Sequence, residues 1–313
     1  MNVPPLQRHV KLQQLRLLVA IAEHGSLLKA AEALHVTQPA ATKSLRQLES
    51  TVGEPLVSRG NAGSVLTPVG EVLCRHAQRI ESELRDAEEA MGLWHSGGAG
   101  HVTIGVLPVA APMLVPEAIR SLAVAAPRIT TRVVEGNSES MFRSLKSGSV
   151  DLVVGRVWPG EDPELSSETL YESPFRLAVR EGHPLAHPKR VRLAQALQHP
   201  WFLPPPGTHT RTAIDDWFRQ SGASTPHIPM ETTSYLVLRS LLLSTNAICP
   251  MPVEVLHEEV QRGLFRFLRL DIDLKLPPIS VVRLLRSHAT PAVSQLVTQL
   301  RLAGQQARLA YAA

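Results

Sequence analysis

Three apolar stripes at helical spacing near the amino end constrain the fold of this chain more than any other feature. They comprise Leu12, Leu15, Leu18, Val19 and Ala22, then Leu27, Ala30, Ala31 and Leu34, then Ala41, Leu45, Leu48 and Val52. Between the first two, Gly25 can end a helix and Ser26 can cap the next one. Thr37 or Gln38 can cap the third, with Pro39 in its first turn, where a missing N–H costs nothing. We therefore expect three short helices with a tight turn before the third.

The third predicted helix has a polar face opposite its apolar stripe. This face carries an amide, a hydroxyl and two cations, supplied by Gln38, Thr42, Lys43 and Arg46. Amides and hydroxyls can bind base edges or phosphates, and cations can bind phosphate or guanine. The pattern favours a helix-turn-helix that binds DNA. A solvated helix face without a partner would show the same four residues, so the wider sequence has to distinguish the two interpretations.

Spaced motifs around these helices resemble one protein family. They are residues 26–33, Thr37-Gln38-Pro39-Ala40, residues 45–49, Gly53, Leu56, Arg59 and Leu66-Thr67-Pro68-Val69-Gly70. Together they resemble the winged helix-turn-helix of LysR-type transcriptional regulators, and the resemblance extends over nearly the whole chain. Three positions depart from the family pattern: Thr42 stands where Ser is usual, Val57 where Phe is usual, and Ser58 where Glu is frequent. The hydroxyl is retained at Thr42, so we expect the contact chemistry to be retained too.

The resemblance implies a set of DNA-binding residues and of partners. The implied DNA-binding residues are Ser26, Thr37, Gln38, Pro39, Thr42, Lys43, Arg46, Arg59 and Thr67. The implied partners are double-stranded DNA with an inverted-repeat operator, a small-molecule effector, RNA polymerase and further copies of the chain, as a homodimer or a homotetramer. Residues 12–49 look closest to regulators of sugar-binding-protein or aromatic-acid catabolic operons, which identifies no effector.

A heptad seam follows and predicts a long helix. Its apolar positions are spaced by three or four residues, at Leu66, Val69, Leu73, Ala77, Ile80, Leu84, Ala87, Met91 and Trp94. A second copy of the helix is the simplest partner, which predicts a coiled-coil dimer; packing on the helix's own chain is the alternative. A dimer suits a DNA-binding protein because paired heads can bind half-sites about one helical turn apart. The Gly-rich cluster that follows predicts a hinge.

Strand-like and helix-like runs alternate beyond the hinge. Their βαβαβ order up to residue 155 predicts a parallel sheet with helices on both faces, and a second alternation from 175 to 285 predicts a second lobe. The resemblance implies the same architecture, a two-lobed α/β domain similar to type II periplasmic binding proteins. A final amphipathic helix at 291–307 is expected to pack on the first lobe. The expected domains are an all-α winged helix-turn-helix (8–66), a linker and dimerisation helix (67–96), a hinge (97–101), lobe I (102–171 and 286–307) and lobe II (172–285).

Turns at the carboxyl ends of the predicted strands form the candidate effector site. Ligands of open α/β sheets bind there, where loops and helix N-termini present free N–H groups. The candidate residues are Pro108, Asn137, Ser138, Thr208, His209, Arg211 and Thr232, of which the three with hydroxyls come from the family analogy. Each turn could equally be a capped helix start without a ligand. Residues 107–111 lack the Ser/Thr pair with which many relatives hold a carboxylate, so the effector is less acidic or is held by the amide, imidazole and guanidinium groups of the set.

Charge and composition limit the alternatives. The net charge of +4 is modest, but residues 1–70 carry seven Lys/Arg against four Glu, whereas residues 71–96 carry three Arg against six acids, which favours DNA contact through the first segment. No run of about eighteen apolar residues and no leader pattern is visible, so we expect a cytoplasmic protein. Cys74 and Cys249 lie far apart and the histidines lack metal-site spacing on a helix, so we assign no disulfide, metal or cofactor.

Two other functions could use a two-lobed domain of this kind. An enzyme is one, but the sequence has no G-x-S-x-G elbow, no GxxxxGK[ST] phosphate loop, no GxGxxG after a strand and no zinc spacing. An exported solute-binding protein is the other, and the amino-terminal helix-turn-helix counts against it. The sequence therefore predicts a ligand-responsive transcriptional regulator without enzymatic activity.

Overall fold

The computed structural model describes residues 6–60, 63–96, 100–157, 160, 162–172, 174–270, 274, 276–285 and 289–311. The chain divides into two compact units. The amino-terminal unit comprises Met1–Gly97 with Lys146–Ser149, and the carboxyl-terminal unit comprises Gly98–Leu145 with Val150–Ala313. Each unit has hydrophobic cores of its own. None of the helices in these ranges combines the length and apolar character that crossing a membrane requires.

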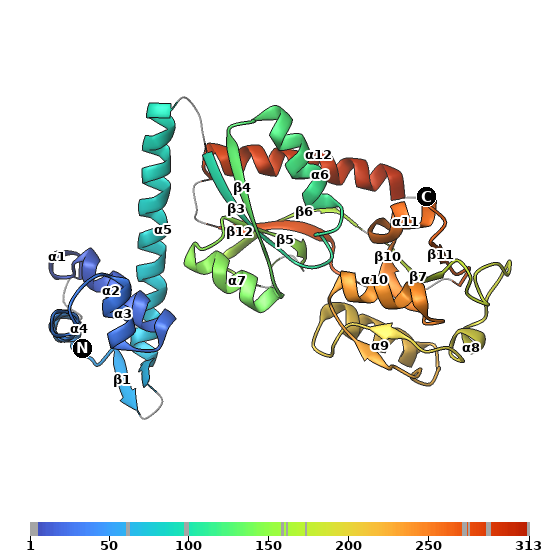
Figure 1. The fold of residues 1–313 in the computed structure, drawn as a ribbon, viewed down its shortest axis with the longest axis horizontal. Coiled ribbons are helices and arrows are strands. Elements are labelled where there is room, and N and C mark those ends of the chain that lie inside the picture. Colours follow the sequence, from blue (N-terminus) through green and yellow to red (C-terminus); the bar gives the residue numbers. More distant parts are fainter. Residues whose placement is uncertain are drawn as a thin grey trace. The chain divides into compact units, whose positions relative to one another are not determined.

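The amino-terminal unit is a helical cluster with a small β-hairpin (Figure 1). Its elements are α1 (Leu6–His9), α2 (Leu12–His24), α3 (Leu27–Ala33), α4 (Gln38–Val52), β1 (Val57–Gly60), β2 (Gly63–Leu66) and α5 (Pro68–Ser96). Helices α2, α3 and α4 are the three helices predicted from the apolar stripes, and the inward faces of all three meet in one core. The wing implied by the family resemblance is the antiparallel β1–β2 hairpin.

The helix ends follow the local signals in the sequence. Gly25 ends α2 with φ of 62°, the left-handed conformation that glycine adopts without strain. Ser26 and Thr37 occupy the N-cap positions of α3 and α4 with extended backbone, and Pro39 lies in the first turn of α4. Between α3 and α4, His35 is left-handed as well, with φ of 53°. The turn that orients α4 is therefore tight and includes one backbone position that suits glycine better than most residues.

The heptad seam of α5 is divided between two surroundings. Leu73, Cys74 and Ala77 pack against the apolar side of α2, in a core shared with the end of α4. Between 37% and 65% of the area is exposed at four seam positions, Val69, Ile80, Leu84 and Met91, and at Val72 beside the seam. Part of the seam thus packs on its own chain, which was the alternative to a partner helix, and part is exposed. The side chain of Trp94 and residues 97–99 of the expected hinge lie outside the described residues.

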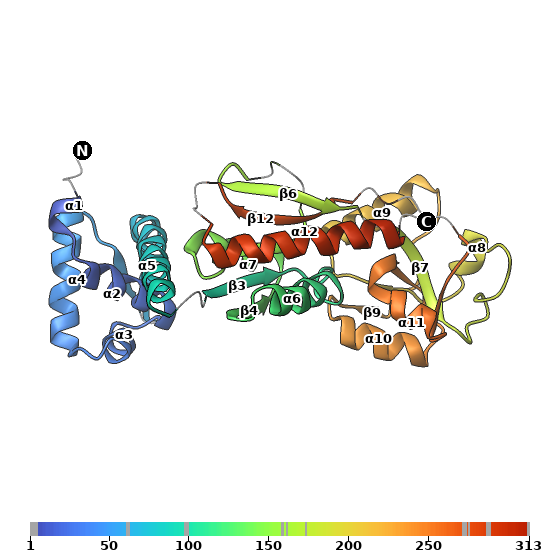
Figure 2. The ribbon, with the colours of Figure 1, turned by 90° about the horizontal axis from the view of Figure 1, so that it is seen from above.

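Lobe I of the carboxyl-terminal unit is a five-stranded sheet covered on both faces (Figure 2). Its strands are β3 (Gly100–Val106), β4 (Ile129–Glu135), β5 (Leu152–Arg156), β6 (Leu165–Tyr171) and β12 (Ile279–Leu284), in the order β4-β3-β5-β12-β6. Helices α6 (Leu114–Ala125) and α12 (Pro291–Tyr311) pack together on one face, and α7 (Ser138–Ser147) packs on the other. Alternation along β5 explains this, since Leu152 and Val154 face α6 and α12 whereas Val153 faces α7.

The position of β12 corrects the expected lobe boundary and sheet type. Strand β3 is parallel to β4 and β5, as predicted, but β12 is antiparallel to both β5 and β6. Residues 279–284 therefore belong to lobe I, although the sequence placed them in lobe II, and the sheet is mixed rather than wholly parallel. The chain leaves lobe I between β6 and β7 and returns between β11 and β12. Helix α12 then packs on lobe I, as predicted.

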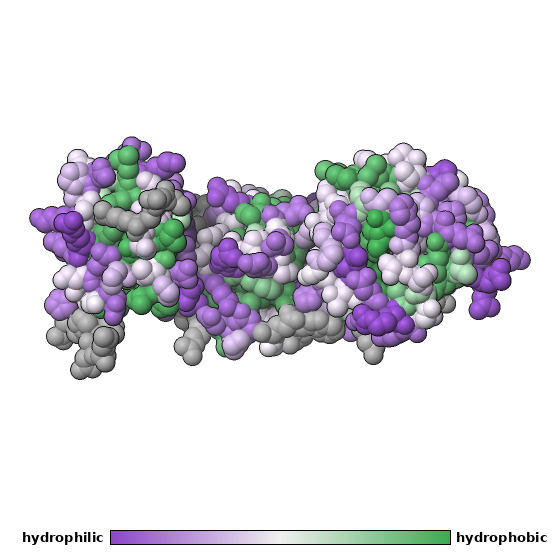
Figure 3. Space-filling model, turned by 90° about the horizontal axis from the view of Figure 1, so that it is seen from below, coloured by the Kyte–Doolittle hydropathy of each residue, from purple (hydrophilic) through white to green (hydrophobic). Residues whose placement is uncertain are grey.

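Lobe II contains the remaining elements. These are β7 (Phe175–Arg180), α8 (Leu193–Ala196), β8 (Phe202–Leu203), α9 (His209–Gln220), β9 (Met230–Glu231), α10 (Tyr235–Ser244), β10 (Cys249–Pro252), η1 (Val253–Leu256), α11 (His257–Gln261) and β11 (Phe265–Phe267). Strand β7 lies between β10 and β11, antiparallel to both, and β8 pairs in parallel with β9. Trp201 is fully buried at the centre of the larger of the two cores. Figure 3 shows hydrophobic areas on the surface of this unit among hydrophilic ones.

Candidate functional site

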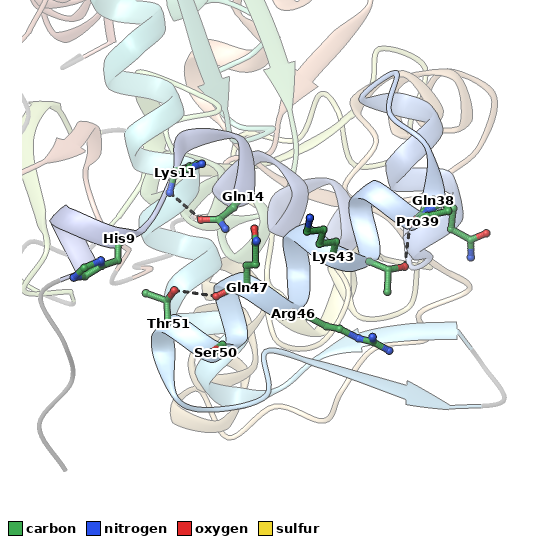
Figure 4. A pocket seen from close by; sticks show the side chains of 11 residues that line it. His9, Lys11, Gln14, Gln38, Pro39, Lys43, Arg46, Gln47, Ser50 and Thr51 are labelled. Atoms are coloured by element: carbon green, nitrogen blue, oxygen red, sulfur yellow. Dashed lines mark hydrogen bonds between the residues drawn. The ribbon is translucent and has the colours of Figure 1, made fainter.

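The outward face of α4 lines a groove on the amino-terminal unit. Gln38, Pro39, Thr42, Lys43 and Arg46, all predicted to bind DNA, line this groove together. Lys43 and Arg46 are exposed, whereas Ala41, Leu45 and Leu48 on the opposite face are buried. Figure 4 shows the cationic side chains projecting from α4. The apolar stripe therefore holds the helix in the unit and leaves two cations and an amide facing outward.

Six further residues line the groove that the sequence interpretation did not include. They are His9, Lys11, Gln14, Gln47, Ser50 and Thr51, of which the last three belong to α4 and the first three come from α1 and the start of α2 (Figure 4). Gln47 lies four residues after Lys43, so continuing the helical face by one turn would have found it. Lys11 and Gln14 come from the start of α2, where the Gln14 carboxamide oxygen accepts the Lys11 backbone N–H at 2.9 Å. This contact caps the start of α2, and Lys11 lines the groove together with residues of α4.

A carboxylate ties the wing to the end of α4. The Glu49 Oε1 atom accepts the backbone N–H of Leu56 at 2.9 Å and that of Val57 at 3.3 Å. Hydrogen bonds to an ionised acceptor are stronger than neutral ones, so this contact fixes where β1 begins relative to α4. The sequence interpretation did not identify Glu49 as a positioning residue.

Four other predicted DNA-binding residues have different surroundings. The Thr67 hydroxyl donates to the Pro55 carbonyl at 2.7 Å and accepts the Gly70 N–H at 3.0 Å, so it caps α5 and anchors the wing rather than facing outward. Ser26 and Thr37 occupy N-cap positions and do not line the groove. Arg59 lies in β1, and its side chain is outside the described residues. Among these four residues, Thr67 has a hydroxyl that both donates and accepts within the described part of the unit.

A second hollow, with a volume of about 960 Å³, lies between the two lobes of the carboxyl-terminal unit. We call it the interlobe cleft. The turns after β3, β4, β8 and β9 line it, as expected for an α/β fold that presents loops and helix N-termini at strand ends. Its volume is within the range of small-molecule sites. Of the seven predicted effector residues, the cleft is lined by Pro108, Asn137, Ser138, Thr208, His209 and Thr232.

Arg211 is the predicted effector residue that does not line the cleft. Its Nε donates to Asp215 at 3.0 Å, and its Nη1 donates to Glu231 at 2.6 Å and to the Pro204 carbonyl at 3.0 Å. The carboxylates hold the pKa of Arg211 above its usual value. The guanidinium therefore joins α9 to β9 and to the loop after β8.

A buried charge pair lies beneath the cleft, and the sequence interpretation missed it. Arg156, at the end of β5, lines the cleft although only 6% of it is exposed. Its Nη1 donates to the Pro277 carbonyl at 2.8 Å, and its guanidinium lies 5.0 Å from the centre of the Phe175 ring. Burial lowers the pKa of Arg156, and the nearby carboxylate of Glu254 opposes that shift. Tyr171 contacts the same carboxylate at 3.4 Å. The contact between Tyr171 and Glu254 therefore links lobe I to lobe II.

The described side chains contain no group of three or more His, Cys, Asp or Glu residues that could hold a metal ion. Both cysteines are free and buried. Burial raises the pKa of the Cys74 thiol to about 11.

Two protein-family descriptions match the chain, one for each unit. Residues 12–71 match the bacterial regulatory helix-turn-helix of the lysR family, and residues 95–305 match the LysR substrate binding domain. Among curated proteins, the transcriptional regulator GbpR of Rhizobium radiobacter is 36% identical over 245 residues, which cover 77% of this chain and 80% of the relative. The regulator CfxR of Cupriavidus necator is 31% identical and covers 82% of this chain and 80% of its own.

Solved structures show the same fold. The structure of full-length CbnR complexed with its target DNA superposes with a TM-score of 0.66 and 21% identity, and covers 94% of this chain and all of the other. At this identity the likeness concerns the fold, including the amino-terminal helices and both lobes.

Proposed function

Because the chain belongs to the LysR family of bacterial transcriptional regulators, we propose that it binds operator DNA through α4 and the wing. The observation that carries the proposal is the groove along α4, where Gln38, Lys43 and Arg46 converge on one outward face. An amide can pair with adenine and an arginine with guanine, while a lysine neutralises phosphate. The similarity to a protein whose structure was solved with its target DNA supports the same use of the fold.

We propose that residues at the groove edge add contacts to the DNA backbone. Lys11 contributes a cation beside α4, and Gln47 extends the polar face by one helical turn. Contacts of this kind set the register of a protein on the duplex without reading sequence. Ser26, Thr37 and Arg59 remain predicted contacts, whereas Thr67 is proposed to act by holding the wing.

The exposed part of the α5 seam supports association of two copies. Val69, Ile80 and Met91 are surface residues on a helix of 29 residues, and a matching helix would remove them from water. Paired heads would then bind an inverted repeat. Whether dimers join further into tetramers is tested by the mass of the protein in solution by sedimentation.

The interlobe cleft is the proposed effector site. Six of the predicted residues line it, and both lobes contribute. A ligand that contacts both lobes favours one arrangement of them over another, and only such differential affinity can change activity. We propose that the chain acts by binding and not by catalysis, and that it works in the cytoplasm, where operator DNA is. The names of the curated relatives, which are transcriptional regulators, support this.

The test is footprinting and gel-shift titration of the full chain on DNA from upstream of its own coding region. Gln38→Ala and Arg46→Ala should each weaken specific binding about 10-fold or more, since one good base contact contributes on the order of 1–3 kcal/mol. Lys43→Ala should weaken binding to all sequences and lower the salt slope by about one. Arg262→Ala, which removes an exposed cation from lobe II, is the matched control and should change neither.

Undiminished specific binding by Gln38→Ala and Arg46→Ala would remove α4 as the reading element. Absence of binding to any upstream fragment would reject the proposed function. Turnover of a metabolite by the purified chain would favour the enzyme alternative.

A further inference from the structure

We propose that the ligand of the interlobe cleft is an uncharged, hydroxyl-rich molecule of the sugar or polyol class. The inference rests on the proposed function, because it assigns a ligand class to the proposed effector site. Four properties of the lining carry it: the state of its cationic groups, the charge at its rim, its hydroxyl groups and its aromatic rings.

The guanidinium group in the cleft wall already has partners. Arg156 donates to the Pro277 carbonyl and lies over the Phe175 ring, and the negative charge of Glu254 opposes the lowering of its pKa by burial. A carboxylate ligand would have to compete with a buried anion for the same cation, and separating a buried charge pair is costly. Among the described lining residues, the other basic side chain is His209, which is exposed. The cleft therefore gives an anionic ligand little uncommitted positive charge.

The rim of the cleft carries negative charge. Glu135 is the last residue of β4 and Glu139 lies in the first turn of α7, and both line the cleft. Glu139 pairs with Arg143 at 2.7 Å, whereas Glu135 has no ion pair among the described residues. Like charges repel, so these carboxylates disfavour a ligand carboxylate, but each can accept a hydrogen bond from a ligand hydroxyl.

Hydroxyl and amide groups form most of the uncharged polar lining. They belong to Asn137, Ser138, Thr208, Thr210, Thr232 and Thr233. Three N-terminal caps already occupy first-turn N–H groups: Asn137 accepts Ser140 N–H, Thr208 accepts Arg211 N–H, and Ser234 accepts Val237 N–H. The caps reduce the number of free backbone N–H groups with which the helix N-termini could bind an anion. By contrast, the hydroxyls of Thr210 and Thr233 make no hydrogen bond within the described residues. A hydroxyl both donates and accepts, which matches ligand hydroxyls.

Aromatic side chains supply the apolar part of the same cleft. Phe175, Phe202 and Tyr235 line it from three different elements of lobe II. An aromatic ring can pack on the C–H face of a sugar ring while hydroxyl groups at the ligand's edge meet the threonines. The cleft volume of about 960 Å³ is within the range of sites that bind small molecules.

The experiment compares uncharged and acidic ligands of equal carbon skeleton. The full chain is titrated by calorimetry with neutral aldoses and polyols, and with the corresponding aldonic and uronic acids. We expect at least one neutral compound to bind, and its acid counterpart to bind at least about 10-fold more weakly. Tighter binding of the acid, or binding of no neutral compound in the series, overturns the proposal.

Two isosteric variants test whether the cleft is the site. Thr210→Val and Thr233→Val should each weaken binding of the neutral ligand about three- to 10-fold, because each removes one hydrogen bond without changing volume. Thr212→Val is the matched control, since Thr212 is exposed on the same helix and does not line the cleft. Unchanged affinity in both cleft variants places the ligand elsewhere and overturns the proposal.

A gel-shift assay on the same preparation distinguishes failure of the proposed ligand class from failure of the proposed DNA-binding function. Retained operator binding with no neutral ligand rejects the ligand class and leaves the proposed regulatory function intact. If the unmodified chain does not bind operator DNA, the proposed function itself is rejected.

Discussion

Protonation of one buried histidine should destabilise lobe II as the pH falls. The His183 ring is 2% exposed, and its two nitrogens have opposite roles. Its Nδ1 accepts the Leu185 backbone N–H at 3.0 Å, while its Nε2 faces the Asn246 carbonyl at 3.2 Å and donates to it. Only the neutral tautomer with hydrogen on Nε2 fits this arrangement. A proton added to Nδ1 would face the Leu185 N–H directly.

The magnitude follows from the pKa of this group. Burial lowers the pKa of His183 from 6.5 to about 4, and the hydrogen bond to Asn246 opposes this while nearby His199 and Arg180 add to it. The unfolded chain therefore binds more protons than the folded one between these two values, so the free energy of unfolding rises with pH in that window. Its contribution is complete above pH 6.5 and is lost as the pH falls toward 4. At about 1.4 kcal/mol per pKa unit, the loss between pH 7 and pH 4.5 is on the order of 2 kcal/mol.

Urea unfolding followed by tryptophan fluorescence measures this loss, because Trp201 lies in the same core as Leu185. Other titrating groups change stability too, so the measurement is a comparison of two chains at two pH values. His183→Asn keeps an acceptor for the Leu185 N–H and does not titrate. We expect the variant to be less stable than the unmodified chain at pH 7, and the difference between the chains to shrink by about 2 kcal/mol at pH 4.5. A difference that stays constant between the two pH values would refute the reasoning.

Three further predictions concern the amino-terminal unit. Glu49→Ala should lower the free energy of unfolding by about 2–3 kcal/mol, because it leaves two wing N–H groups without their carboxylate, whereas Glu49→Gln should cost less; chemical denaturation measures both. His35→Val should lower stability by about 1 kcal/mol and His35→Gly should not, because φ is 53° there; thermal melting compares the pair. Buried Cys74, with its pKa raised to about 11, should resist iodoacetamide at pH 8 until urea is added, as mass spectrometry would show.

Residues that cap or end helices made the helix-turn-helix predictable from the sequence. Gly25, Ser26, Thr37 and Pro39 each act on the backbone beside them, so their effect does not depend on what the chain meets elsewhere. The apolar stripes were equally informative, because a helix of this spacing has one face to bury whatever covers it. The same reasoning identified the outward face of α4.

Contacts between residues far apart in the sequence could not be predicted in this way. Residues 281 and 282 are buried on opposite faces, which predicts a strand but does not say which sheet receives it, so β12 was placed in the wrong lobe. Arg211 was predicted to contact a ligand because it lies in the turn after a predicted strand, and nothing near it indicated that Glu231 from β9 would pair with its guanidinium. The contact between the Thr67 hydroxyl and the Pro55 carbonyl was likewise not visible in the sequence.

The buried pair beneath the cleft had a signal that could have been used. Arg156 ends a strand whose other residues are wholly buried, and Glu254 lies within an apolar segment. A buried charged residue is costly without an opposite charge nearby, and Arg156 and Glu254 carry opposite charges. The sequence shows two such residues but not that they meet.

The return of β12 and α12 to lobe I has a consequence for synthesis on the ribosome. The sheet of lobe I lacks β12 until that strand has emerged from the ribosome, and the core of lobe I lacks Leu296 and Leu300 until α12 has emerged. Lobe II is complete by then, because all of its strands lie between the two parts of lobe I. During this interval the nascent chain contains all the strands of lobe II but an incomplete lobe I. The apolar faces of lobe I stay exposed until β12 and α12 cover them, and exposed apolar surface of this kind is what chaperones bind.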